Sequence, residues 1–152
     1  MRAVLTRVKS ASVTIDGKVN GKIGRGFLIL LGIGPNDTEK ECRYLAEKAL
    51  GLRIFEDENE KMNLSVTDIG GEALVVSQFT LLANYAHGNR PDYLGSEKPE
   101  RANELYEYFV SLMREGLSHV GTGIFGADME VTIVNDGPVT IVMDSEVLKK
   151  KH

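Results

Sequence analysis

The sequence predicts an α+β fold in which two packed β-sheets form a partly closed barrel that two main helices cover. Three observations predict it: β-prone segments outnumber helical ones, the two kinds do not alternate regularly, and 152 residues is the size of one compact domain. The composition, with 42% hydrophobic and 26% charged residues, supplies an ordinary core and surface. We therefore expect residues 1–152 to form a single domain.

The first third of the chain is typical of strands. Apolar residues alternate with polar ones around Val13 and Ile15, stop at Asp16-Gly17 and resume at Val19, which predicts a hairpin with a tight turn. The apolar run 27–31 is bounded by glycines and is too short for most helices. It predicts a buried strand at the centre of the sheet.

Two segments show the spacing of helices with one apolar face. The first begins at Thr38, which fits a capping box with Glu41, and the second has Pro99 at its start and should end at Gly116 or Gly121. The apolar positions are Cys42, Leu45, Ala46, Ala49 and Leu50 in the first segment, and Ala102, Leu105, Phe109, Leu112 and Met113 in the second.

Further strands are expected in the second half. Residues 73–81 are β-prone throughout and predict a buried strand, although they carry polar side chains that need partners. Residues 129–133 and 139–143 predict the two strands of a closing hairpin, turned by residues 135–138. The segment 84–99 is rich in Gly, Asn, Pro and Ser, and its length favours a functional loop.

Charge and composition exclude several classes of protein. The 18 Lys and Arg against 22 Asp and Glu give a net charge of −4, without the basic footprint of a duplex-binding protein, so we expect no DNA partner and only local RNA contacts. The basic run 149–152 is typical of a solvated tail. No apolar stretch is long enough to span a membrane, and no secretory signal is present, so we expect a cytoplasmic protein with no membrane partner.

Familiar catalytic motifs are also missing. The glycines of the first third form neither a dinucleotide-binding fingerprint nor a phosphate-binding loop, and Ser77 does not lie in a G-x-S-x-G elbow. The chain has one cysteine, Cys42, expected as a small buried residue, and no H-E-x-x-H motif. We therefore expect no metal site, no cofactor and no Ser-His-Asp triad.

Two polar clusters remain on the predicted strands: Ser77-Gln78-Phe79-Thr80 and Asn135-Asp136-Gly137-Pro138-Val139-Thr140. A structural interpretation is available, because Asn-Asp-Gly-Pro is good turn chemistry and hydroxyl residues occur on many strands. The functional interpretation is a site that works through backbone N–H donors and hydroxyls, as an oxyanion hole does. It requires both clusters to share one pocket.

At these two clusters the chain resembles the D-aminoacyl-tRNA deacylase family, whose two signatures appear here as residues 77–81 and 135–140. On either side of residues 88–91 the chain departs from the family pattern, at Asn84-Tyr85-Ala86-His87 and at Asp92-Tyr93-Leu94. Supporting matches run through the chain, at residues 2–8, 24–26, 53–55, 61–63, 88–91 and 123–129.

The resemblance implies the family's fold and its reaction, hydrolysis of the ester between a D-amino acid and the terminal ribose of tRNA, with tolerance of glycyl-tRNA. It implies a homodimer with active sites at the subunit interface, in which a cis Gly137-Pro138 peptide reaches the partner's pocket and excludes L-aminoacyl side chains. The catalytic residues it implies are Ser77, Gln78, Phe79 and Thr80, and the substrate-binding residues are Asn135, Gly137, Pro138, Thr140 and Arg90.

Two mechanisms follow from this resemblance. Thr80 could be the nucleophile, or the 2′-hydroxyl of the terminal adenosine could help to activate water while Thr80 positions groups. We favour the second mechanism, because no His or Lys lies near Thr80 in the sequence to act as its base. Two other hypotheses stay open: a module that binds a small carbonyl compound or an RNA end without turnover, and an interaction protein whose loop 84–99 docks a partner.

Overall fold

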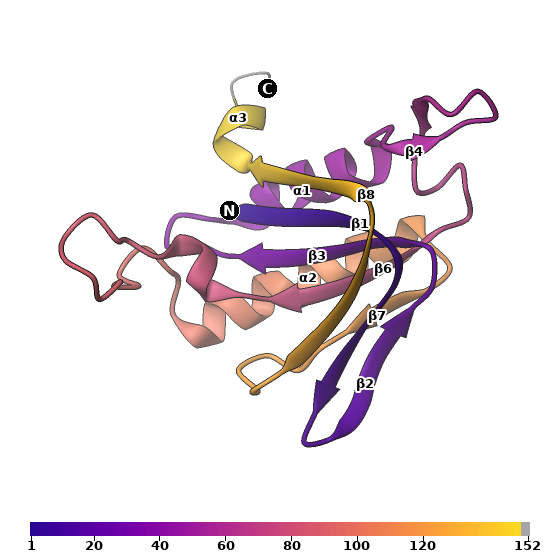
Figure 1. Ribbon diagram of the computed structural model, residues 1–152. Helices are drawn as coiled ribbons and strands as arrows, with labels where there is room; N and C mark the ends of the chain where they lie inside the picture. The colour runs from indigo at the N-terminus through magenta and orange to yellow at the C-terminus, as the bar shows by residue number, and fades with distance from the viewer. Residues whose placement is uncertain (150–152) are drawn as a thin grey trace.

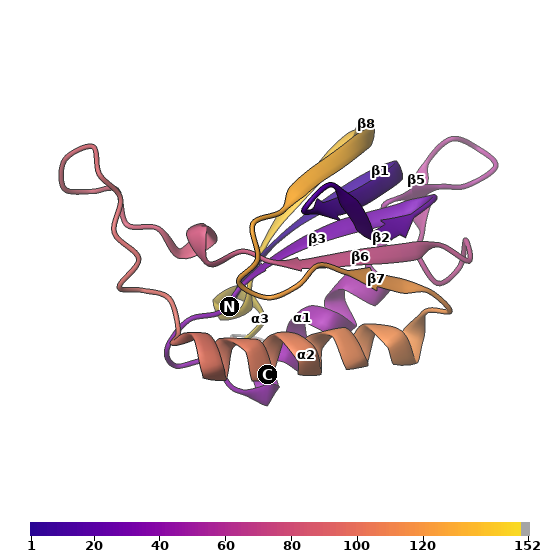
Figure 2. The same ribbon diagram turned by 90° about the horizontal axis from the view of Figure 1, so that it is seen from below.

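The computed structural model describes residues 1–149, in which a strongly curved β-sheet carries its helices on one face (Figures 1 and 2). The strands of the main sheet are β1 (Arg2–Ile15), β2 (Lys18–Ile23), β3 (Gly26–Gly32), β6 (Glu72–Ser77), β7 (Val120–Thr122) and β8 (Glu130–Asp144). A separate small sheet contains β4 (Phe55–Glu56) and β5 (Met62–Leu64). The α-helices are α1 (Glu39–Gly51), α2 (Pro99–Gly116) and α3 (Ser145–Lys149).

The main sheet curves into a barrel because β1 is long enough to serve two halves of it. The first half of β1 pairs with β3, the second half pairs with β2, and β8 follows β1 on its other side almost from end to end. The free edges approach where Asn20 donates to the carbonyl of Thr122, 2.7 Å away. A Cβ on Gly21 would lie 2.5 Å from that carbonyl oxygen, so only glycine permits this approach. The predicted α+β fold with a partly closed barrel is confirmed.

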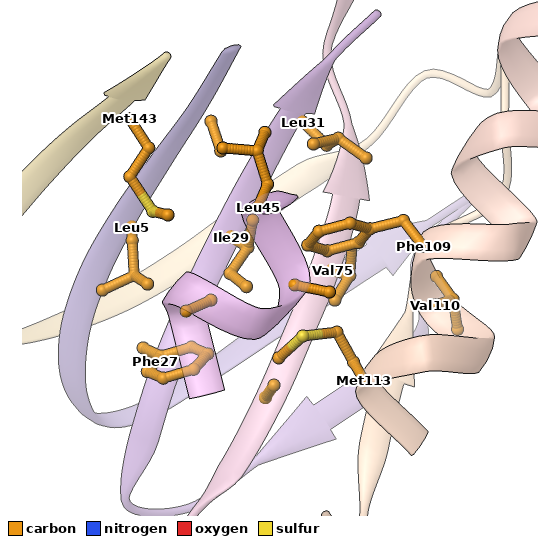
Figure 3. Packing of buried hydrophobic residues seen from close by; sticks show 14 of the residues in the cluster. Leu5, Phe27, Ile29, Leu31, Leu45, Val75, Phe109, Val110, Met113 and Met143 are labelled. Atoms are coloured by element: carbon orange, nitrogen blue, oxygen red, sulfur yellow. The ribbon is translucent and has the colours of Figure 1, made fainter. Parts of the chain in front are cut away.

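The two faces of the sheet bury different cores. On β3, Phe27, Ile29 and Leu31 point toward the helices, while Leu28 points into the barrel, as the two-residue period of a strand requires. Figure 3 shows the larger core, where Phe109 and other residues of α2 pack against these strands. The run 27–31 is therefore a central, doubly covered strand, as the sequence predicts.

Both predicted helices form with the expected boundaries. Thr38 caps α1, and its backbone N–H and its hydroxyl donate to the Glu41 carboxylate at 2.6 and 2.7 Å. Pro99 occupies the first turn of α2, where a missing N–H costs nothing, and Gly116 ends that helix.

The predicted closing hairpin is wrong: residues 130–144 form the single strand β8. Both halves of β8 pair with β1 in the same direction, so the chain does not reverse at the Asn-Asp-Gly-Pro segment. That segment instead forms a bulge, in which residues 136–139 face the single residue Arg7 of β1. Pro138 is tolerated there because a bulge on an edge strand does not need its N–H group.

The strand predicted over residues 73–81 ends early, at Ser77, and a 3-10 helix (Phe79–Leu82) follows. The strand stops because β3 ends at Gly32 and β7 pairs with β6 only as far as Val75, so no neighbour remains to bond the backbone. Local hydrogen bonds replace the ladder, such as the one from the N–H of Leu81 to the carbonyl of Gln78.

Other elements were not predicted, namely β5, β7 and α3. Lys149, placed by sequence in a solvated tail, ends α3 and forms ion pairs with Glu41 and Glu146 at 2.8 and 2.9 Å. The rest of that basic run, residues 150–152, lies outside the described residues. No helix over residues 1–149 is long and apolar enough to cross a membrane.

Candidate active site

A cavity of about 450 Å³ opens where β6 gives way to the 3-10 helix. All four residues of the first polar cluster line this cavity, so the structure brings Ser77, Gln78, Phe79 and Thr80 together as expected. The wall opposite comes from the segment before α2 and from the loop that leads into β8. The other lining residues are Ile33, Tyr93, Ser96, Glu97, Pro99, Ala102, Phe125, Gly126, Ala127 and Met129.

Hydrogen-bond donors are concentrated on the β6 side of this cavity. The Gln78 side-chain amide donates to the Thr80 hydroxyl oxygen at 3.0 Å, which fixes both side chains. Phe79 and Thr80 begin the 3-10 helix, and their backbone N–H groups donate to no acceptor in the described part of the chain. These two N–H groups are available to a ligand oxygen.

Aromatic rings form the apolar part of the site. Phe79 is 55% exposed, an unusual state for a phenylalanine, and its ring meets the edge of Tyr93 at a centroid distance of 5.0 Å. Phe125 lines the opposite wall and contacts Tyr106 in a similar edge-on arrangement at 6.3 Å. A planar ligand group can therefore lie against Phe79 beside the polar donors.

Burial keeps the hydroxyl of Tyr106 and the thiol of Cys42 in their neutral, protonated forms. Burial raises the pKa of Tyr106 to about 12, and its hydroxyl donates to the carbonyl of Val75 at 2.7 Å. Burial likewise raises the pKa of Cys42 to about 12, and this thiol is fully buried. Cys42 is therefore the small core residue that the sequence predicts, and neither group can act as a nucleophile in the cavity.

A metal site is not built into the described residues. Across residues 1–149, no three His, Cys, Asp or Glu side chains lie close enough together to hold an ion. The carboxylate that lines the cavity, Glu97, accepts a hydrogen bond from the N–H of Lys98 at 2.7 Å.

The second polar cluster lies outside this cavity in the same chain. Asn135, Gly137, Pro138 and Thr140 are all exposed on β8, at and beside its bulge. The Gly137-Pro138 peptide is cis, as the resemblance implies. The N–H of Val139 donates to the Asn135 side chain at 3.2 Å and closes the bulge. Within one chain, the two clusters therefore do not share a pocket.

Arg7 holds the bulge through hydrogen bonds, and the sequence did not single this residue out. Its guanidinium is 5% exposed and donates to the carbonyls of Ile54 at 2.7 Å and Asp136 at 3.0 Å. Asp136 and Glu56 also place carboxylates 3.6 and 4.0 Å away. The signal in the sequence was an arginine within the apolar first strand, because an arginine buried there needs fixed hydrogen-bond acceptors.

Arg90 does not line the cavity. It lies on an exposed hairpin-like arm that leaves the 3-10 helix and returns at Tyr93 (Figure 1). The base of this arm is closed by two backbone hydrogen bonds between Asn84 and Asp92, at 2.8 and 2.9 Å. The arm thus starts and ends beside the cavity but carries Arg90 away from it.

Fold and site together define an α+β protein with a barrel-like sheet and a cavity of main-chain donors beside an exposed phenylalanine. The family model described as D-Tyr-tRNA(Tyr) deacylase matches residues 4–144. The chain therefore belongs to the D-aminoacyl-tRNA deacylase family of enzymes.

Relatives of the same length agree with this assignment. A D-aminoacyl-tRNA deacylase of Koribacter versatilis is 58% identical over 96% of this chain and 98% of its own. One from Roseiflexus castenholzii is 56% identical over 99% of this chain and 96% of its own.

Solved structures share the fold. The c-Myc DNA Unwinding Element Binding Protein superposes with a TM-score of 0.90 at 44% identity, covering 95% of this chain and 98% of the other. A probable eukaryotic D-amino acid tRNA deacylase superposes with a TM-score of 0.82 at 17% identity, covering 94% and 98% of the two chains, and shows likeness of fold alone.

Proposed function

We propose that this protein hydrolyses the ester between a D-amino acid and the 3′-terminal ribose of tRNA, releasing the free D-amino acid and tRNA, and that it accepts glycyl-tRNA in the same way. The observation that carries the proposal is that Phe79 and Thr80, whose backbone N–H groups have no acceptor in the described part of the chain, line a cavity that also contains an exposed aromatic ring. These groups match what an aminoacyl ester on adenosine needs.

In this proposal the ester carbonyl oxygen accepts from the N–H groups of Phe79 and Thr80. Water attacks the carbonyl carbon, the negative charge develops on that oxygen, and both donors stabilise it. The intermediate then collapses: the bond to the ribose 3′-oxygen breaks, and that oxygen leaves with the proton that the water has given up. Loss of one such donor typically costs about 3–4 kcal/mol in the transition state. The adenine lies against Phe79, where base and ring can stack.

Thr80 positions groups rather than attacking the ester. Its hydroxyl oxygen already accepts from the Gln78 amide, which supplies no base to take its proton. The 2′-hydroxyl of the terminal ribose is adjacent to the ester in the substrate itself. We assign to it the task of activating the attacking water.

We propose that the active unit is a homodimer in which the bulge of one copy, residues 136–139, enters the cavity of the other. Support comes from β8, whose outer edge pairs with no strand among residues 1–149 and which exposes Val134 and Val142 at 46% and 75%. A long edge strand with exposed apolar residues is a liability in a monomer. In the proposed dimer, the second copy brings the two polar clusters together.

Chirality is then read by exclusion. The main chain at Gly137 and Pro138 of the second copy forms a wall against the α-carbon of the substrate. A D-residue turns its hydrogen to this wall, whereas an L-residue would direct its side chain into it. Glycine has no side chain to collide with the wall, which is why glycyl-tRNA is included in the proposal.

The proposed activity is tested by release of free amino acid from matched D-, L- and glycyl-tRNA. We expect release from the D- and glycyl substrates and little from the L-substrate. Equal release from the D- and L-substrates would show that L-residues are not excluded. Binding without release would identify a module that captures the RNA end without turnover.

The shared site is tested by mixing two inactive variants. One variant carries an altered bulge (Gly137→Val with Pro138→Ala), and the other lacks two side chains that line the cavity (Phe79→Ala with Gln78→Ala). If each site uses both copies, mixed dimers recover up to one intact site each, and activity returns on mixing. A protein that sediments as a monomer, or a mixture that stays inactive although mixed dimers form, would contradict the shared site.

A further inference from the structure

The arm formed by residues 84–92 projects from the body of the molecule in both ribbon views (Figures 1 and 2). Residues 84–91 are all exposed, and Tyr85 has 82% of its surface in water. The described hydrogen bonds of residues 84–91 stay within the arm, for example from the N–H of Ala86 to the Asn84 side chain at 3.0 Å. Packing within this chain therefore does not explain why a tyrosine stands at this position.

The one carboxylate of the arm, Asp92, lies at its base, where it pairs with Asn84. Residues 73–91 contain no Asp or Glu, although 22 of the 152 residues are acidic. Arg90 and His87 are the basic residues of the same stretch, and both are exposed. With His87 neutral, Arg90 and Asp92 balance, so the arm carries no net negative charge and presents Arg90 and Tyr85 beyond its base, on a chain whose net charge is −4.

The arm is also continuous with the candidate active site. It follows the 3-10 helix that carries Phe79 and Thr80, and the residue after the arm, Tyr93, lines the cavity. A ligand whose end occupies the cavity and whose chain continues outward meets the arm as it leaves. The combination of aromatic ring and cation is the one that binds unpaired RNA, because bases stack on the ring and phosphates pair with the cation.

We propose that the arm 84–92 binds the unpaired nucleotides that precede the terminal adenosine of the substrate, with Tyr85 as a stacking platform for a base and Arg90 as a phosphate contact. This inference rests on the proposed function and assigns to Tyr85 a role that the cavity alone does not supply. It also gives an acidic protein a local means of holding RNA.

The test compares two substrates of different length. Tyr85→Ala is expected to raise the KM for D-aminoacyl-tRNA about tenfold or more, the effect of losing one stacked base. For the D-aminoacyl ester of adenosine alone, which has no preceding nucleotides, kcat/KM should change less than twofold. Arg90→Gln should make the KM for tRNA less sensitive to salt, by about the slope that one phosphate contact contributes. Val19→Ala, on the exposed β1–β2 hairpin and 61% exposed, is the matched control.

Three results would overturn the inference. Unchanged kinetics of Tyr85→Ala on tRNA would show that the ring holds no base, and equal losses on both substrates would show that the arm only shapes the cavity. A change in the sedimentation of Tyr85→Ala would make the arm a contact between copies of this chain.

Binding of uncharged tRNA, measured by fluorescence anisotropy, separates this inference from the proposed function. If the wild-type protein releases no amino acid but Tyr85→Ala still weakens tRNA binding about tenfold, the arm stands and the proposed reaction fails. If deacylation is normal and binding is unchanged in the variant, the arm fails and the reaction stands.

Discussion

The guanidinium of Arg7 holds the carbonyl oxygen of Asp136 at 3.0 Å, directly before the Gly137-Pro138 segment. Arg7 is also the single residue of β1 that faces the bulge of β8, so the side chain fills the gap that the bulge opens. A second hydrogen bond, to the carbonyl of Ile54 at 2.7 Å, fixes the other end of the guanidinium. The position of the bulge is therefore set by a buried cation with two fixed acceptors.

We expect Arg7→Lys to lower stability and activity together. A lysine ammonium cannot reach both carbonyls in the geometry of the planar guanidinium, so one buried acceptor loses its partner, at a cost of about 1–3 kcal/mol. Thermal unfolding and kcat/KM on D-aminoacyl-tRNA measure the two effects. Arg25 is an exposed arginine that lines a small cavity together with Arg7, Glu56 and Asp136, and Arg25→Lys is the control that should change neither. Wild-type behaviour of Arg7→Lys would show that the bulge holds its own shape.

Gly137→Ala should disturb the bulge for a steric reason. Gly137 has a φ of +130°, and a Cβ there would lie 2.8 Å from a methyl group of Val139 and 2.9 Å from the Arg7 guanidinium. We expect a loss of about 1–3 kcal/mol in stability from the strained backbone and at least a tenfold fall in deacylation. Gly51→Ala, which meets nothing within 4 Å, controls for the added methyl group. Full activity of Gly137→Ala would remove this segment from the site.

Thr80→Ala is expected to keep substantial activity, within about tenfold of the wild type, because in the proposed mechanism the side chain positions groups and forms no covalent intermediate. A substrate whose terminal adenosine lacks the 2′-hydroxyl should lose about a hundredfold or more, the size of a general acid–base contribution. Single-turnover kinetics on the two substrates and two proteins measure this. The reverse pattern, with Thr80→Ala inactive and the 2′-deoxy substrate hydrolysed, would establish Thr80 as the nucleophile.

Glu41 should make stability depend on pH in the acid range. Burial on its own raises the pKa of Glu41, but hydrogen bonds from Lys149 and Thr38 outweigh burial and lower the pKa to about 2. Since this folded-state pKa lies below the ordinary value of 4.5, the stabilisation is complete above about pH 5 and is lost as the pH falls toward 2.

Glu41→Gln is therefore expected to lower the free energy of unfolding at pH 7 by about 1–3 kcal/mol, as loss of a hydrogen-bonded charge does. The difference from the wild type should shrink between pH 5 and pH 2 in denaturant titrations. Glu47→Gln, at an exposed carboxylate on the same helix, should show no such convergence. A constant difference across this range would mean that the ionised form of Glu41 is not favoured by folding.

Local sequence determined the helices and the central strand. Thr38 with Glu41 and Pro99 mark helix starts through bonds that close within a few residues, and the apolar run 27–31 has one way to be buried. The polar cluster 77–80 was recognised for the same reason, because its members are neighbours in the chain and line one cavity together.

Tertiary structure decided what depends on distant partners. The Asn135–Pro138 segment has turn chemistry, yet it became a bulge because β1 pairs with β8 on both sides of it and Arg7 fills the gap. Residues 79–81 do not continue the predicted strand, because no neighbouring strand pairs with β6 beyond Ser77. Backbone groups take the partners that the fold brings to them, and a sequence read locally does not contain those partners.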